Sequence, residues 1–249
     1  MMKFLLGTTM FAGLMVAGAA QAADLKAPAY KAPQAPYYYN WGGCYIGGQA
    51  GWARARSDLI NTTNTTFFGD VLPGDGFRVS DSGGIAGGQI GCNFQSGQWV
   101  FGLEGQGSWL GVKTSFLNTF FGTTDDNFEV KSNWLASVAG RVGFANNNWL
   151  FYAKGGFAAS GWRVSVTDVV GPNVGSGSDK HTHTGFVVGT GIEYGLTQNW
   201  IFGVEYDYYS FSKESYQLNG TEPANRSYAF DFKPQNVHAV VGRISYKFY

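Results

Sequence analysis

Eight charged residues occur within otherwise apolar segments and alternate with the apolar positions. They are four carboxylates and four cations: Glu104, Glu193, Glu205, Asp207, Arg141, Lys154, Arg243 and Lys247. Charges in an apolar setting must pair, because removing the partner of a buried charge is strongly destabilising. We therefore predict a network of ion pairs and hydrogen bonds. Two hypotheses stand for it: a permanent structural plug, or a set of partners whose exchange opens a narrow aqueous path.

Histidine supplies the next candidate chemistry. His181 and His183 form the sequence HTH within a polar segment, and imidazole is a ligand for haem and for transition metals. No cluster of carboxylates and cysteines accompanies them, so an ordinary polar loop is the alternative. His238 has no identifiable Ser or Asp partner that could act as nucleophile or base. We predict no enzymatic activity, no cofactor and no metal site.

Strands must position these residues, because a period-two alternation returns eight times after Gly43. The segments lie at about 43–56, 82–95, 99–112, 132–145, 149–162, 184–196, 199–212 and 236–249. Each is long enough for the roughly 9–11 residues with which a tilted strand crosses a bilayer. Their connections are alternately long (57–81, 113–131, 163–183, 213–235) and short (96–98, 146–148, 196–199). This pattern predicts an all-β, eight-stranded antiparallel transmembrane barrel with short periplasmic turns, four long extracellular loops and periplasmic termini.

The stretch WIFGVEYDYYSF, Trp200 to Phe211, shows how the two faces of a strand are assigned. Side chains alternate between faces, so the aromatic residues share one face and Glu205 and Asp207 share the other. Aromatic residues concentrate at both ends of the apolar faces, as in the interfacial girdles of membrane barrels. We expect the aromatic faces to meet lipid and the charges to fill the lumen, which is narrow in an eight-stranded barrel.

Antiparallel pairing of segments 43–56 and 82–95 brings the only two cysteines, Cys44 and Cys92, close together at the periplasmic end. A cross-strand disulfide is one hypothesis, since an exported protein meets oxidising conditions. A one-residue slip in register would separate the two side chains. Two free cysteines therefore remain the alternative.

The remaining sequence sets the domain organisation and excludes one class of partner. Residues 1–22 have a lysine, an apolar run and a final Ala-Gln-Ala, which predicts a secretory signal peptide. Residues 23–42, with two Lys-Ala-Pro units, predict an extended Pro-rich periplasmic lead, and the barrel follows at 43–249. Seventeen basic and seventeen acidic residues leave no net charge, which argues against nucleic acid as a partner.

Several motifs resemble one known family. They are YNWGGCYIGGQAGW, GGQIGCNFQSGQWVFGLEGQGSW, LASVAGRVGFANNNWLFYAKGG, GTGIEYGLTQNWIFGVEYDYYSF and the ending VGRISYKFY. The family is the small outer-membrane β-barrels of alphaproteobacteria, which includes surface antigens called immunogenic or porin-family proteins and is similar in fold to the OmpA transmembrane domain. The resemblance implies a location in the cell outer membrane. It implies as partners membrane lipid and lipopolysaccharide, the barrel-insertion machinery and extracellular ligands of the loops, which for some members include hemin.

The resemblance also implies a C-terminal assembly signal, since such barrels end on an aromatic residue in register with other apolar positions. Here Ile244, Tyr246 and Phe248 carry the alternation and Tyr249 lies one residue beyond it. We predict that Phe248 is the recognised position. The function expected is a structural and surface-interaction role in the envelope. A narrow porin-like channel for small solutes and a surface receptor for hemin or another ligand are the alternatives, and the oligomeric state is open.

Overall fold

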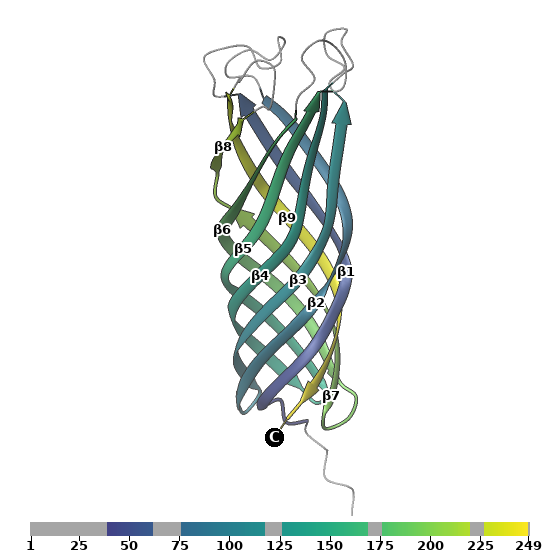
Figure 1. Ribbon diagram of the computed structural model, residues 1–249. Helices are drawn as coiled ribbons and strands as arrows, with labels where there is room; N and C mark the ends of the chain where they lie inside the picture. Colours follow the sequence, from purple (N-terminus) through teal and green to yellow (C-terminus); the bar gives the residue numbers. More distant parts are fainter. Residues whose placement is uncertain (1–38, 62–75, 118–125, 169–175, 220–226, 249) are drawn as a thin grey trace, which may run out of the picture. The chain divides into compact units, whose positions relative to one another are not determined.

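The computed structural model describes residues 39–61, 76–117, 126–168, 176–219 and 227–248. The predicted signal peptide, and the predicted lead before residue 39, lie outside these ranges. Nine strand segments form one sheet (Figure 1). They are β1 (Gly43–Asn61), β2 (Gly76–Ser96), β3 (Trp99–Leu117), β4 (Asp126–Asn146), β5 (Trp149–Asp168), β6 (Ser176–Gly195), β7 (Trp200–Phe211), β8 (Glu214–Asn219) and β9 (Ser227–Lys247). In the described ranges, no helix is long and apolar enough to cross a membrane.

The sheet closes on itself. Each neighbouring pair of strands is antiparallel, and β1 pairs with both β2 and β9. Both β7 and β8 pair with β9, and β8 follows β7 after a break at Ser212 and Lys213. These two segments are one barrel strand in two pieces, so the barrel has eight strands. Closure leaves no backbone edge inside a bilayer, and the predicted eight-stranded antiparallel barrel is confirmed.

Most of the strands are longer than predicted. Both β2 and β4 have 21 residues, about twice the roughly 9–11 that a crossing requires. Much of the sequence expected to form the long loops is therefore strand, since β1 continues to Asn61 and β4 begins at Asp126. Beyond the bilayer a strand can be polar on both faces, so the alternation fades while the backbone ladder continues. The connections that remain, 62–75, 118–125, 169–175 and 220–226, fall outside the described residues.

The short connections at the other end have the backbone that their sequences favour. Gly97, in SGQ, has a φ of 61°, and Asn147, in NNN, has a φ of 53°. This left-handed region is open to glycine and is tolerated by asparagine better than by most residues. Two neighbouring pairs of strands, β2–β3 and β4–β5, are thereby joined by tight turns.

The outer surface is an apolar band bounded by aromatic side chains. Exposed tryptophans lie towards its two ends: Trp99, Trp149 and Trp200 beside the short turns, and Trp52, Trp109 and Trp134 farther along the strands. On β7, Trp200, Phe202 and Val204 are exposed, whereas Glu205 and Asp207 are buried. The aromatic face therefore points outwards and the carboxylates point into the lumen, as the alternation predicts.

The core of the protein is the lumen itself, which is filled in three layers. One apolar cluster, including Trp41, Leu150 and Ile201, lies near the short turns. A larger apolar cluster fills the lumen farther along the strands and includes Leu110 and Val187. Between the two clusters lie the charged side chains.

Candidate functional site: the ionic plug of the lumen

Seven of the eight predicted charges converge in the lumen, and together they form what we name the ionic plug. Its members are Glu104 on β3, Arg141 on β4, Lys154 on β5, Glu193 on β6, Glu205 and Asp207 on β7, and Arg243 on β9. All point inwards because each occupies the inward parity of its strand. The side chains are deeply buried, with exposed fractions between 0% and 4%.

Arg243 contacts three of the four carboxylates of the plug. Its guanidinium donates to the carboxylates of Glu104 and Glu205, and its Nη2 lies 3.8 Å from Oε1 of Glu193. The planar guanidinium suits this arrangement, because its five N–H groups point in several fixed directions. One side chain from β9 is thereby linked to β3, β6 and β7.

Arg141 and Lys154 complete the ion pairs. Nη2 of Arg141 donates to Oε2 of Glu193 at 2.8 Å, and its Nη1 lies 3.3 Å from Oε2 of Glu104. Nζ of Lys154 lies 2.7 Å from Oε1 of Glu205 and 3.0 Å from Oδ1 of Asp207. Four carboxylates therefore face three cations, and the plug carries one surplus negative charge when all seven groups are ionised.

Two tyrosines that sequence reasoning did not single out belong to the same network. The Tyr45 hydroxyl donates to Glu104 at 2.5 Å and accepts from Nη1 of Arg141 at 2.8 Å. The Tyr152 hydroxyl donates to Glu205 at 2.5 Å and accepts from Nη1 of Arg243 at 2.9 Å. The guanidinium carbon of Arg141 also lies 3.9 Å from the centre of the Tyr152 ring, a cation–π distance. Each hydroxyl thus bridges a carboxylate and an arginine.

Inward glycines make room for these rings. A Cβ atom built at Gly191 would lie 2.4 Å from the Tyr152 hydroxyl oxygen, and one at Gly91 would lie 2.5 Å from that of Tyr45. Both distances are well below van der Waals contact, and both hydroxyls are held by charged partners. The two glycines are therefore required by close approach.

Replacing Gly191 by Val should lower the free energy of unfolding by roughly 1–3 kcal/mol, the usual loss when a packed interior is overfilled. Urea unfolding of the barrel in lipid vesicles, followed by tryptophan fluorescence, measures this. Gly155→Val is the matched control, because Gly155 faces outwards and a Cβ there would meet its nearest atom at 3.9 Å. An equal loss in the two variants would show that valine acts on the strand backbone and not on Tyr152.

Lys247 does not lie where we predicted it. Among the residues described, none of the ion pairs of the plug includes it. Its ammonium donates to the backbone oxygen of Asn40 and lies 4.3 Å from the centre of the Tyr39 ring. Lys247 does point inwards, as its parity predicts. It is close to the end of β9, however, and therefore lies at the periplasmic mouth of the barrel, beside Tyr39 and Asn40.

The mouth itself is closed by residues 39–42, which we had assigned to the extended lead. Tyr39 and Trp41 have exposed fractions of only 2% and 0%. The Trp41 backbone N–H donates to Oε1 of Gln95, and the Tyr39 hydroxyl donates to the backbone oxygen of Gln198. Large aromatic side chains in this segment were the available signal, since each gains much by burial.

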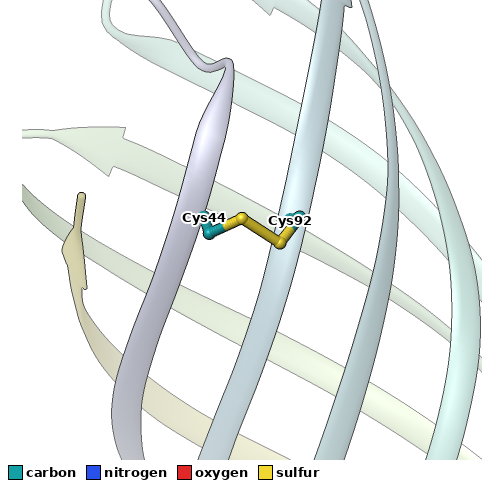
Figure 2. Close-up of a disulfide and its surroundings, with 2 residues drawn as sticks. All are labelled: Cys44 and Cys92. Carbon is teal, nitrogen blue, oxygen red and sulfur yellow. A yellow bond between two sulfur atoms is a disulfide. The ribbon is translucent and has the colours of Figure 1, made fainter. Parts of the chain in front are cut away.

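The two cysteines are direct partners across β1 and β2. Figure 2 shows the sulfur atoms of Cys44 and Cys92 bonded, and the two Cα atoms are 3.9 Å apart. Both residues are exposed and have the outward parity, since their neighbours Tyr45 and Gly91 point inwards and are buried. Of the two hypotheses from the sequence, the geometry corresponds to the cross-strand disulfide, and it places the bond on the outer wall.

The histidines of the HTH sequence lie on β6 and not in a loop. The buried ring of His183 is 3.0 Å from the Ser212 backbone oxygen through Nδ1 and 2.8 Å from the Tyr216 hydroxyl through Nε2. Nε2 of His181 lies 3.1 Å from a carboxylate oxygen of Asp179. Both ring nitrogens of His183 are therefore engaged inside the barrel, where they connect β6 to Ser212 in the break after β7 and to Tyr216 on β8.

The predicted assembly signal lies on the outer wall. Ile244, Tyr246 and Phe248 are all exposed, and the Tyr246 and Phe248 rings are 5.3 Å apart. Tyr249 falls outside the described residues. Recognition of Phe248 by the insertion machinery stays a prediction.

Comparison with known proteins places this architecture in a family. Residues 9–248 match the family model described as "Outer membrane protein beta-barrel domain". The "25 kDa outer-membrane immunogenic protein" of Brucella melitensis is 31% identical over 209 residues, which cover 83% of this chain and 81% of that protein. The "22 kDa outer membrane protein" of Rhizobium leguminosarum is 32% identical over 182 residues, which cover 72% and 69% of the two chains.

Among solved structures, the outer membrane protein OprG of Pseudomonas aeruginosa aligns over 84% of this chain and 98% of its own, with 13% identity and a TM-score of 0.46. The attachment invasion locus protein Ail of Yersinia pestis aligns over 83% and 99%, with 12% identity and a TM-score of 0.38. The assignment depends on the family model and the sequence relatives, and by both the chain belongs to the outer membrane protein β-barrel domain family and is an outer-membrane protein.

Proposed function

We propose that this outer-membrane protein is a closed barrel with a structural and surface-interaction role in the cell envelope, and that its lumen does not carry solutes. The observation that supports the proposal is the ionic plug. Every one of its seven charged side chains pairs with an opposite charge inside the lumen. This network links strands that are not neighbours in the sheet, such as β3 and β9. Contacts between neighbouring strands alone would not link them.

Opening a path would require several of these pairs to separate at once. Separating a buried pair leaves charges without partners and costs several kcal/mol. The plug also lies between two apolar clusters, one of which includes Tyr39 and Trp41 at the mouth. Small polar solutes would have to cross three packed layers in series.

The surface-interaction part of the proposal concerns the opposite end of the strands. Several strands continue past the aromatic band, which would present the connecting segments outside the cell. The Brucella melitensis relative is named as immunogenic, and we extend a surface-exposed role from it to this chain. We propose no catalytic step, and the engaged ring nitrogens of His183 give a hemin site at the HTH sequence no support.

A narrow charged channel is the second candidate, and one observation favours it. Lys154 contacts two carboxylates at similar distances, 2.7 Å to Glu205 and 3.0 Å to Asp207, within a plug that has a surplus carboxylate. Exchange of Lys154 between these partners is the simplest rearrangement that could open a path for a small cation. It would still leave the two apolar clusters in place.

Single-channel recording of the refolded barrel in a planar bilayer decides between the two functions. We expect no steady conductance from the wild type, with folding established by heat-modifiable gel migration. A Tyr39→Ala/Trp41→Ala variant should also be silent, because it opens the mouth and leaves the plug intact. Steady wild-type conductance that Glu104→Ala alters would contradict the proposal and support the channel.

A further inference from the structure

A cluster of polar side chains lies on the outer wall where β1, β9 and β7 run side by side. In the register of the sheet, Arg54 of β1 is the partner of His238 of β9, and His238 is the partner of Tyr208 of β7. The next row towards the extracellular end holds Arg56 and Asn236. All have the outward parity that Trp52 and Val240, one row nearer the bilayer centre, share.

Neither arginine of this cluster forms an ion pair with a carboxylate of the described residues. Both side chains are exposed, and among the described residues no ion pair includes either of them. Other outward cations differ, since Arg78 pairs with Asp58 at 3.1 Å and Lys113 pairs with Glu129 at 2.9 Å. Arg54 and Arg56 therefore carry two positive charges that no ion pair within the described residues compensates, on a chain with no net charge.

The other members of the cluster are held in fixed positions. The Tyr206 hydroxyl lies 2.8 Å from Nδ1 of His238, and the Tyr208 hydroxyl donates to Oδ1 of Asn236 at 2.8 Å. With Oδ1 occupied, Asn236 has its amide N–H groups left to donate. When Tyr206 donates to Nδ1 of His238, the ring hydrogen is on Nε2, which is then a second donor. The cluster thus combines two guanidinium groups with further hydrogen-bond donors, and none of its six members is a carboxylate.

Its height on the barrel indicates what it meets. Arg54 lies two residues beyond Trp52 on the same face, about 7 Å farther along the strand. Trp52 is exposed, and because tryptophan is enriched at the interface between the hydrocarbon and the headgroups, we expect Trp52 to mark that interface. On that basis we expect Arg54 and Arg56 at the level of the outer-leaflet headgroups, with their exposed side chains on the outer wall.

We propose that Arg54, Arg56, Asn236, His238, Tyr206 and Tyr208 form a binding site for the phosphate groups of lipopolysaccharide. Guanidinium groups bind phosphate oxygens in a bidentate, charge-assisted manner, which fits the two arginines. Directly below Trp52, the outward Ala50 and Gly242 are register partners. A Cβ atom at Gly242 would lie 3.8 Å from its nearest atom, so packing within the barrel does not require glycine there. Two small side chains at these positions leave space on the outer wall for an acyl chain.

The test is titration of the folded full-length barrel with lipid A that carries its two phosphates, followed by native mass spectrometry. The wild type should bind this lipid at least about tenfold more tightly than enzymatically dephosphorylated lipid A, since charge-assisted contacts carry the preference. Arg54→Gln/Arg56→Gln should abolish the difference. Lys113→Gln/Lys131→Gln, which alters two cations that already pair with Glu129, should retain it.

Two results would overturn the proposal: wild-type affinity in the Arg54→Gln/Arg56→Gln variant, or equal binding of the two lipids by the wild type. Displacement of lipid A by millimolar inorganic phosphate would overturn the lipid assignment, because the site would then be one for a free anion. Heat-modifiable migration establishes that each variant is folded. The proposal depends on the outer-membrane location and not on a closed lumen, so conductance by the wild type would leave it standing.

Discussion

Arg243→Met should lower the free energy of unfolding by about 3–5 kcal/mol, or prevent folding altogether, because it breaks a buried network by removing one partner. Arg243 donates to Glu104, Glu205 and the Tyr152 hydroxyl. Without it, four carboxylates face only two cations, and the side chains of all six are buried. Methionine fills most of the same volume, so the loss reports charge and hydrogen bonding and not a cavity.

Charge balance makes the effects of single substitutions unequal. Glu205→Gln leaves three carboxylates and three cations, so we expect a clearly smaller loss than for Arg243→Met. The double variant Arg243→Met/Glu205→Gln returns the plug to one surplus negative charge, as in the wild type. It should therefore be more stable than Arg243→Met alone, which a double-mutant cycle measures as coupling between the two sites.

Urea unfolding in lipid vesicles measures all three variants, and Lys131→Met is the control. Lys131 pairs with Glu129 on the outer surface, where removing a cation should cost at most about 1 kcal/mol. Where Arg243→Met gives no folded band on a heat-modifiability gel, recovery of that band in the double variant is the equivalent result. Equal losses for Arg243→Met and Lys131→Met would mean that the plug contributes no more to stability than a surface pair.

The wall of the barrel was predictable because alternation is a local property of a strand. The parity of Trp200, Glu205 and Asp207 follows from their spacing alone, and it holds along the whole of β7. The break after Phe211 was not predictable in the same way. It depends on how Ser212 meets β6, where its backbone N–H donates to the backbone oxygen of Thr184, and no local pattern encodes that contact.

The membership of the plug was predictable only in part, because parity gives the face of a residue and not its height in the lumen. Glu104 and Arg243 come from distant strands, and their contact depends on the register of the whole sheet. Tyr45 and Tyr152 have the inward parity too, but the sequence does not distinguish an inward aromatic residue that joins the ionic plug from one that only packs in the apolar core. Lys247 shares that parity and lies at a different height, beside residues 39–42, whose packing has no periodic signal.

Removing the disulfide should have the second large effect on stability. The bond joins residues 48 apart in the sequence, so it closes a long loop in the unfolded chain. The chain-entropy model assigns about 4 kcal/mol to a loop of this length, and measured values are typically about 2–4 kcal/mol. We expect Cys44→Ala/Cys92→Ala to lower the free energy of unfolding within that range while the folded barrel keeps its register.

A pair of isoleucines beside the disulfide provides a matched control for the same unfolding measurement. Ile46 and Ile90 are register partners two residues from the cysteines, on the same two strands and the same exposed face. Ile46→Ala/Ile90→Ala changes the lipid-facing surface of β1 and β2 without removing a cross-link. Its loss should be much smaller than that of the cysteine variant, because both isoleucines contact lipid and leave no internal cavity.

Reductant separates the cross-link from the side chains themselves. Wild-type barrel unfolded and refolded in excess dithiothreitol should show the stability of Cys44→Ala/Cys92→Ala, and that variant should not respond to reductant. Agreement between the two would place the whole effect in the covalent link and its constraint on the unfolded chain. If reduction leaves the wild type unchanged while the double variant is destabilised, then packing of the cysteine side chains, and not the bond, stabilises this part of the wall.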